Sequence, residues 1–234
     1  MLALSKRLII VVEGQSESNF VGRVLGPHLQ SFGIAATATI VGKAKAAARG
    51  RSGPGVRGGN RYADWKRDIR NCLSGNPGGN FRLSTLCDLY GLPDDFPGWA
   101  SQPGDHNTAA RCDRLQEEIA RDIGDRRLIP YIQRHEFEAL VLAARDRLED
   151  LYDAEDQLSG LAALNSEIAG MAPEEINDSP ASAPSKRLLG RIPNYRKTED
   201  GPAAIELAGL DTLRLQCPRF DRWVTSLERW GLCE

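Results

Sequence analysis

Carboxylate side chains follow separate apolar segments of this 234-residue sequence. Glu13, Asp88 and the pair Glu136 and Glu138 each follow a segment that has the character of a buried strand. Oxygen ligands of this kind are those that hard cations such as Mg²⁺ and Mn²⁺ prefer. Carboxylates gathered in one place repel each other, and a bound cation offsets that repulsion. If the fold brings these residues together, the sequence predicts a divalent metal site.

Each acid also has a structural explanation when it is taken alone. Glu13 and Glu17 flank a turn that leads into a helix, where acids stabilise the first turn. Asp88 stands at the start of a loop, a common place for a turn residue. Glu136 and Glu138 suit the beginning of a helix for the same reason as Glu17. The metal hypothesis therefore depends on the set meeting in space.

The apolar runs alternate with segments of helical spacing. The predicted strands cover residues 8–12, 34–41, 81–87 and 128–132. The first predicted helix begins with Ser16 as its N-cap, and three further helices span 62–73, 108–123 and 135–143. Pro130 weakens the fourth strand and favours a position at a sheet edge. This alternation predicts an α/β fold with a parallel sheet of about four strands flanked by helices. In such folds the ligand crevice lies at the carboxyl ends of the strands, where all four acids would converge.

The pattern changes beyond residue 145. Residues 146–156 are acidic with helical spacing, 161–171 predict a short helix, and 172–185 predict a linker or a loop folded against the core. Residues 210–230 carry spaced apolar side chains. We therefore expect a metal-binding α/β domain over 1–145 and a helical extension over 146–234 packed on it. The aromatic residues of this tail could form a homodimer face, although at this spacing they are typical of a core: Phe220, Trp223 and Trp230.

Composition limits which kinds of metal site the chain can form and in which cellular compartment it can work. The five cysteines are scattered without a CxxC pair, and there are only three histidines. These numbers exclude a zinc ribbon, a disulfide framework and a histidine-rich metal site. The apolar run 8–12 is too short to cross a bilayer, and it lacks the cleavage site of a secretory signal. We expect a cytoplasmic protein with no membrane contact.

Positive charge is concentrated in one segment, although the formal net charge is −2. Residues 42–70 hold nine basic residues against Asp64 and Asp68. Such a segment is typical of polyanion binding, and a solvated surface loop is the alternative. The residues that we expect to contact substrate there are Lys43, Lys45, Arg49 and Arg51.

A second basic group follows the proline-containing stretch near residue 184. Lys186 and Arg187 can neutralise phosphate oxygens. Lys197 can stabilise charge that develops on a leaving group beside a metal. An exposed basic turn is the alternative explanation for all three residues.

Several motifs carry a resemblance to known families. The turn Glu13-Gly14-x-x-Glu17 after an apolar strand, with Asp88 at the end of a later strand, resembles the Toprim domain of topoisomerases, DnaG-type primases and OLD-family nucleases. Four stretches look more specifically like a bacterial Toprim-like family, domain of unknown function 4276. They are VVEGQSE, CDLYGLP, RHEFEALVL and the tail pattern PSKRL…PNYRK…DG…CPRFDRW.

The resemblance implies roles for these residues. Glu13 would be a metal ligand or general acid/base, Asp88 would bind Mg²⁺ or Mn²⁺ as the first acid of an Asp-x-Asp pair, and Glu17 joins the candidate ligands. Position 90 is Tyr90, so the second acid of that pair is missing. Glu136 and Glu138 could supply the missing oxygens.

These expectations lead to three functional hypotheses. The first is a metal-dependent phosphodiesterase, an endonuclease acting on DNA or RNA. The resemblance implies a role in antiphage defence, with a possible partner ATPase. The chain itself has no phosphate-binding GxxxxGK[ST] loop, so it cannot power ATP-driven work alone. The second is a degenerate Toprim-like protein that binds nucleic acid or a partner protein without catalysis. The third is a hydrolase of nucleotides or other small phosphoesters.

Overall fold

The computed structural model describes residues 6–42, 60–101, 108–177 and 182–233. Within these ranges the strands are β1 (Lys6–Val12), β2 (Ile34–Ile40), β3 (Phe81–Asp88), β4 (Leu128–Ile129) and β5 (Ile132–Gln133). The α-helices are α1 (Gln15–Phe20), α2 (Gly26–Gln30), α4 (Tyr62–Ser74), α5 (Thr108–Ile123), α6 (Glu138–Ala143), α7 (Glu155–Glu167), α8 (Pro184–Arg191), α9 (Asp200–Ala208), α10 (Leu210–Gln216) and α11 (Pro218–Leu232). A π-helical turn (Val21–Leu25) joins α1 to α2.

The strands form one parallel sheet in the order β2-β1-β3-β4, and β5 also pairs with β3. Val12 lies opposite Leu86, so the chain leaves β1 beside the last residues of β3. Asp88 lies opposite Gln133, so β5 also ends at that level. The register thus sends three loops out from the same edge of the sheet.

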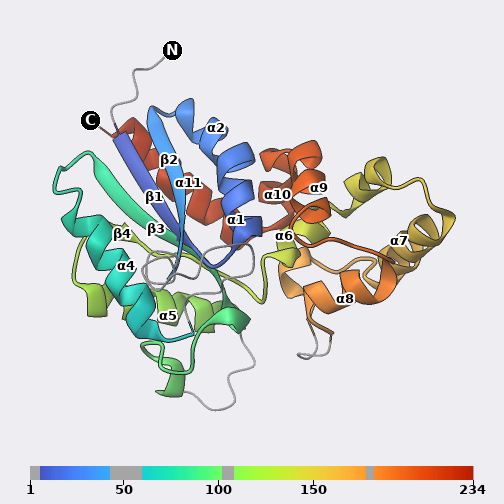
Figure 1. The fold of residues 1–234 in the computed structure, drawn as a ribbon, viewed down its shortest axis with the longest axis horizontal. Helices are drawn as coiled ribbons and strands as arrows, with labels where there is room; N and C mark the ends of the chain where they lie inside the picture. The colour runs from blue at the N-terminus through green and yellow to red at the C-terminus, as the bar shows by residue number, and fades with distance from the viewer. Residues whose placement is uncertain (1–5, 43–59, 102–107, 178–181, 234) are drawn as a thin grey trace, which may run out of the picture.

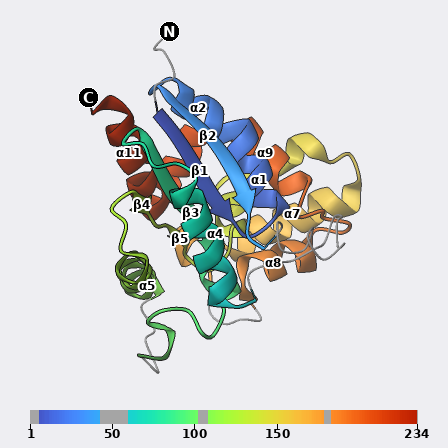
Figure 2. The same cartoon turned by 60° about the vertical axis from the view of Figure 1, so that its left-hand side comes forward.

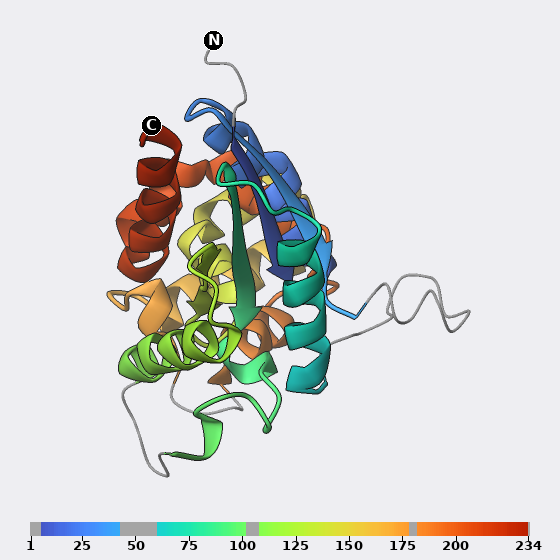
Figure 3. The same cartoon turned by 90° about the vertical axis from the view of Figure 1, so that its left-hand side faces the viewer.

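Each face of the sheet is covered by helices, and the pleat of β1 contributes to both cores. Leu8, Ile10 and Val12 pack in a core with the first helices, α6 and the C-terminal helices. Val11 points to the other face, into a core with α4 and α5. Figure 3 shows the sheet with α11 on one side and α4 on the other. In Figure 2, α4 lies in front of the sheet.

The C-terminal half packs on the sheet domain and continues the same core. Phe220 and Trp223 of α11 are buried against Phe20 and Tyr131, and Trp223 stacks on Tyr131 with 4.5 Å between ring centroids. Trp230 is half-buried against this core. Helices α7 and α8 lie farther from the sheet (Figure 1). These tail aromatics belong to the core, as their spacing favoured.

The prediction of an α/β fold with a parallel sheet flanked by helices and a helical C-terminal part is confirmed. The predicted fourth strand is two short strands, because Pro130 cannot donate to the ladder and the chain bends there. Its predicted place at an edge is correct, since β4 ends the sheet. None of the helices within the described ranges combines the length and apolar character needed to cross a bilayer.

Several predicted boundaries were wrong. Ser16 is not the N-cap of the first helix: Gly14 is, because the side chain of Glu17 accepts a hydrogen bond from its backbone N–H. The helix predicted from His135 begins at Glu138, because His135 has a left-handed backbone (φ 65°) that ends regular structure.

Boundaries also differ in the C-terminal half. The segments predicted as helices over 146–156 and 161–171 are a 3₁₀ turn at Arg145–Leu151 and helix α7, which starts earlier at Glu155. The stretch 172–185 holds a 3₁₀ turn at Pro173–Glu175 and the start of α8. The final segment divides into α10 and α11 at Cys217, because Pro218 starts a new helix as its first residue.

Replacing Phe220 by alanine tests whether α11 is part of the main core. Phe220 has no exposed surface and contacts Phe20, Tyr131 and Trp223. We expect Phe220→Ala to lower the free energy of unfolding by about 3–5 kcal/mol in chemical denaturation. Leu215→Ala, at a side chain that is 85% exposed, is the control and should change it by less than about 0.5 kcal/mol. Equal effects would contradict this packing.

Candidate functional site

Glu13 and Glu17 come from the turn between β1 and α1. Glu13 is the first residue after the strand, and its carboxylate lies directly against Gly91, so closely that a Cβ at position 91 would collide with it. Glu17 stands in the first turn of α1 with only 6% of its surface exposed. Its Oε2 accepts a hydrogen bond from the Gly14 backbone N–H at 3.1 Å. The predicted capping role of Glu17 is therefore real, and it coexists with a place in the cluster described next.

Asp88 is the centre of a group of five carboxylates. It is the last residue of β3, and its Oδ1 is buried without a hydrogen-bond partner among the described residues. Burial raises the pKa of Asp88 well above its ordinary value, and the charges of Glu13, Glu17, Glu138 and Glu136 raise it further. Every acid that the sequence singled out thus acts on this carboxylate. We call these five residues the carboxylate cluster.

Glu136 and Glu138 enter the cluster from the segment between β5 and α6. Oε2 of Glu136 accepts a hydrogen bond of 2.8 Å from the backbone N–H of Ser185, in the first turn of α8. Glu138 is the first residue of α6 and is 5% exposed. Its Oε1 lies 3.0 Å from Nζ of Lys197. A helix N-terminus and an ammonium group therefore offset part of the negative charge.

Lys197 belongs to a loop that is fastened to α1. Its backbone carbonyl accepts a hydrogen bond from the hydroxyl of Ser16 at 3.3 Å, and Asn19 donates to the carbonyl of Thr198 at 3.3 Å. The Lys197 side chain is 39% exposed. The ammonium group therefore stands at the rim of the cluster, beside Glu138 and accessible to solvent.

The cluster keeps one carboxyl near its midpoint of ionisation at neutral pH. Burial is the main cause that raises the pKa of Glu17 to about 7, and the charges of Glu13 and Glu138 add to it. Hydrogen bonds from backbone N–H groups act in the opposite direction. The energetic cost of ionising this site is therefore only partly offset by the protein itself.

The chemical type of the five side chains suits a hard divalent cation, but the distances between them do not. All the donors are carboxylate oxygens, and one oxygen of Asp88 is buried without a hydrogen-bond partner in the described ranges. However, no three Asp, Glu, His or Cys side chains among the described residues stand close enough together to hold one ion. The five acids are near enough to act on one another electrostatically, but binding one ion would require some of their side chains to move closer together.

Tyr90, at the position where the Toprim resemblance predicts an acid, belongs to a hydrogen-bonded group that the sequence did not reveal. Its hydroxyl lies 3.1 Å from Nδ1 of His135, and Asn177 donates to the same hydroxyl. Burial, with the charge of Arg134, lowers the pKa of His135 to about 4, so this ring is neutral at pH 7. Its Nδ1 can then accept a hydrogen bond from the Tyr90 hydroxyl. No local signal could have found this group, because it joins three distant segments.

The basic residues predicted to bind substrate have different surroundings. Lys43, Lys45, Arg49 and Arg51 lie outside the described residues. Lys186 is exposed in the first turn of α8. On the same helix, Arg187 forms an ion pair with Glu167 and donates to the carbonyl of Ser182 at 2.9 Å. Arg187 therefore has a structural partner, and Lys186 faces solvent.

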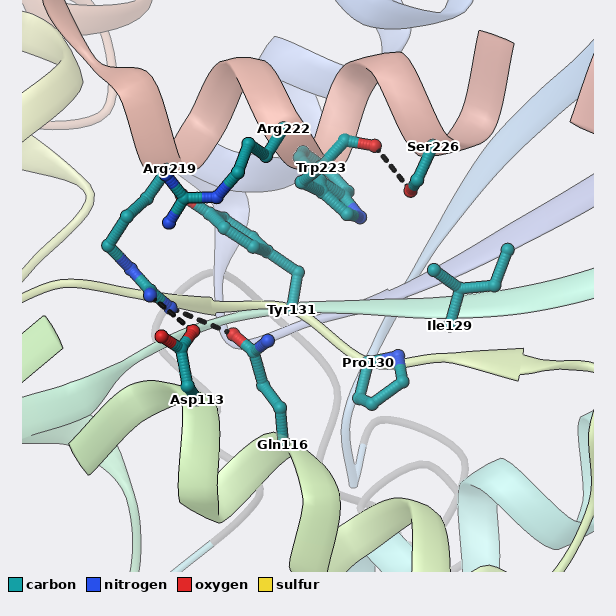
Figure 4. Close-up of a pocket in the computed structure, with 9 residues that line it drawn as sticks. All are labelled: Asp113, Gln116, Ile129, Pro130, Tyr131, Arg219, Arg222, Trp223 and Ser226. Atoms are coloured by element: carbon teal, nitrogen blue, oxygen red, sulfur yellow. Dashed lines mark hydrogen bonds and ion pairs between the residues drawn. The ribbon is translucent and has the colours of Figure 1, made fainter. Parts of the chain in front are cut away.

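A separate cavity of about 190 Å³ lies away from the cluster, between α5 and α11 (Figure 4). Arg219 reaches from α11 to Asp113 and Gln116 of α5, and the stacked rings of Tyr131 and Trp223 line the cavity beside it. None of the five carboxylates lines it. The buried arginine links α11 to α5, so we assign this cavity a packing role.

The pH dependence of stability should show how much the ionisation of Glu17 in the cluster destabilises the fold. The pKa of Glu17 is raised in the folded state, so the protonated carboxyl stabilises the fold. This stabilisation is fully present below pH 4.5 and is lost as the pH rises through about 7. In EDTA, Glu17→Gln should therefore be more stable than the wild type at pH 8, by on the order of 3 kcal/mol, and the difference should vanish near pH 4. Thermal unfolding across pH 4–8 measures this difference. Glu117→Gln, at an exposed position of α5, is the control, and matching curves for both variants would exclude the effect.

Comparisons with known proteins identify a family. No curated protein matches the sequence significantly. Among solved structures, the C-terminal region of the Burkholderia pseudomallei OLD protein is 21% identical with a TM-score of 0.46, over 97% of this chain and 98% of that one. The C-terminal region of the Xanthomonas campestris pv. campestris OLD protein is 18% identical with a TM-score of 0.42, over 97% and 95%. At these values the likeness carries no argument about activity. The model of the family described as "Domain of unknown function (DUF4276)" matches residues 12–228, so the chain belongs to this family, as its motifs indicated.

Proposed function

We propose that this protein is a metal-dependent phosphodiesterase that cleaves nucleic acid, with the carboxylate cluster as its active site. The observation that carries the proposal is the carboxylate of Asp88, whose Oδ1 is buried without a hydrogen-bond partner in the described ranges and whose pKa is raised by burial and then by the charges of four other acids. Such crowding is costly in a folded protein unless a cation offsets it. An all-oxygen set favours Mg²⁺ or Mn²⁺.

The residues of the cluster would divide the work. Asp88, Glu13 and Glu136 would hold the ion, with Glu17 and Glu138 as further oxygen donors. A bound Mg²⁺ or Mn²⁺ would polarise the phosphodiester and stabilise the charge that develops on it. Glu13 is also suited to accept a proton from the attacking water. Lys197, exposed at the rim and beside Glu138, would stabilise the leaving oxygen.

A second candidate function is nucleic-acid or partner binding without catalysis. It is favoured by Tyr90, whose hydroxyl is bound to His135 and Asn177 where the Toprim pattern has a second acid. The absence of three metal-spaced donors among the described residues favours it as well. A role in antiphage defence beside a partner ATPase stays a prediction from the motif resemblance, and a cytoplasmic location stays a prediction from the sequence.

Cleavage assays test the enzymatic proposal. Wild-type protein with Mg²⁺ or Mn²⁺ should cleave plasmid DNA or structured RNA. Glu13→Ala and Glu136→Ala should each lose at least about 100-fold in rate, because each would remove an oxygen ligand of the ion. Glu155→Gln, at an exposed acid of α7, should keep the wild-type rate. Equal rates for all four proteins would overturn the assignment.

Metal binding can be tested without any substrate. At a Mn²⁺ concentration 100 times its Kd, the wild type should gain about 2.7 kcal/mol in stability, seen as a higher unfolding temperature. Asp88→Asn should lose this gain, because it removes the central charge of the cluster. If Mn²⁺ stabilises neither protein while nucleic acid still binds in EDTA, the non-catalytic function is the correct one.

A further inference from the structure

A positively charged rim borders the carboxylate cluster on the side of α5. In a parallel α/β unit the connecting helix runs back antiparallel to the strands, so the first turn of α5 lies at the carboxyl edge of the sheet. That turn carries Arg111, and the loop between β3 and α5 carries Trp99. Arg134 follows β5 at the same edge.

Arg111 is held in a way that leaves its hydrogen-bond donors available. The carbon centre of its guanidinium lies 4.1 Å from the ring centroid of Trp99. Stacking on an aromatic face fixes the plane of a guanidinium while its N–H groups stay free along the edge. Among the described residues, no carboxylate forms an ion pair with Arg111. This differs from Arg187, which already has Glu167.

Arg134 adds a second positive charge beside Arg111. Its Nε donates to the hydroxyl of Thr108 at 2.7 Å. Thr108 and Arg111 are three residues apart on α5 and therefore lie on the same face of the helix. Glu175 is 3.7 Å from Nη1 of Arg134, with a carboxylate side chain that is 66% exposed, so it neutralises this charge only in part.

Tyr90 connects this rim to the cluster. It lies two residues after Asp88, in the turn Leu89–Gly91, and its backbone N–H donates to the carbonyl of His135, the residue after Arg134, at 3.2 Å. Tyr90 is therefore connected to Asp88 along the chain and to Arg134 through His135. Its side chain is fixed by His135 and Asn177, and the residue is 39% exposed. A polyanion reaching Asp88 from this side would pass an aromatic ring and two guanidinium groups.

We propose that Arg111, supported by Trp99 and joined by Arg134, binds a backbone phosphate of the nucleic-acid strand whose scissile bond lies at the carboxylate cluster. The proposal rests on the proposed function and specifies how that site takes its substrate. It differs from the predicted contacts of residues 43–51, which belong to another segment. The ligand chemistry is a phosphodiester, so it does not depend on base sequence.

The salt dependence of binding tests this contact directly. A fluorescent single-stranded oligonucleotide is titrated in EDTA at several salt concentrations, so that binding is measured without cleavage. Arg111→Gln should weaken binding and reduce the slope of log K against log salt by about one unit, because one phosphate contact is lost. Trp99→Leu keeps all charges and should weaken binding about two- to fivefold, since the guanidinium loses its support.

Arg126→Gln is the matched control, because Arg126 is an exposed arginine in the turn before β4, at the opposite edge of the sheet. For Arg126→Gln, the slope of log K against log salt should equal that of the wild type. With the wild type, inorganic phosphate should compete only weakly with the oligonucleotide. If Arg111→Gln and Arg126→Gln behave alike, the inferred contact is overturned, even if the wild type cleaves with Mg²⁺. If the salt slope is reduced only in Arg111→Gln and none of the proteins cleaves nucleic acid, the contact stands and the enzymatic proposal fails.

Discussion

Repulsion among carboxylates at one edge of a parallel sheet is the constraint on which this structure depends. Asp88 cannot move away from the other acids, because it is the last residue of a central strand. Two features of the C-terminal half offset the negative charge: the backbone N–H of Ser185 binds Glu136, and Lys197 pairs with Glu138. The part of the chain up to α6 thus supplies the acids, and the helical extension supplies the opposing charges.

The sequence predicted the cluster because topology alone brings its members together. Apolar β-branched runs followed by helical spacing fix a parallel sheet, and a parallel sheet collects strand ends at one edge. Glu13 and Asp88 needed no further information. Glu136 and Glu138 were also assigned to this edge, although the helix expected to carry both begins only at Glu138.

Features that depend on distant contacts could not be predicted in the same way. Tyr90 contacts Asn177, 87 positions away along the chain, and the left-handed backbone of His135 has no signature in its neighbours. The stacking of Arg111 on Trp99 joins a loop to a helix. Ser16 had the right residue type for a cap, yet the cap is Gly14, because Glu17 reaches back to its N–H. This cap is a local feature, unlike the others, because Glu17 stands only three residues after Gly14, so its signal was present in the sequence.

The arrangement around Tyr90 limits how the cluster can recruit an ion. Asp88 and Tyr90 are fixed by the strand and by the hydrogen bonds of the hydroxyl, so neither can adjust. Glutamates have longer side chains with more rotatable bonds, and Glu13 and Glu136 are only partly buried. Under the proposed function, metal binding would therefore move the longer glutamate side chains around one rigid aspartate. Such a site is less preorganised than a closed cage, and the free energy released by relieving the repulsion would contribute to its affinity.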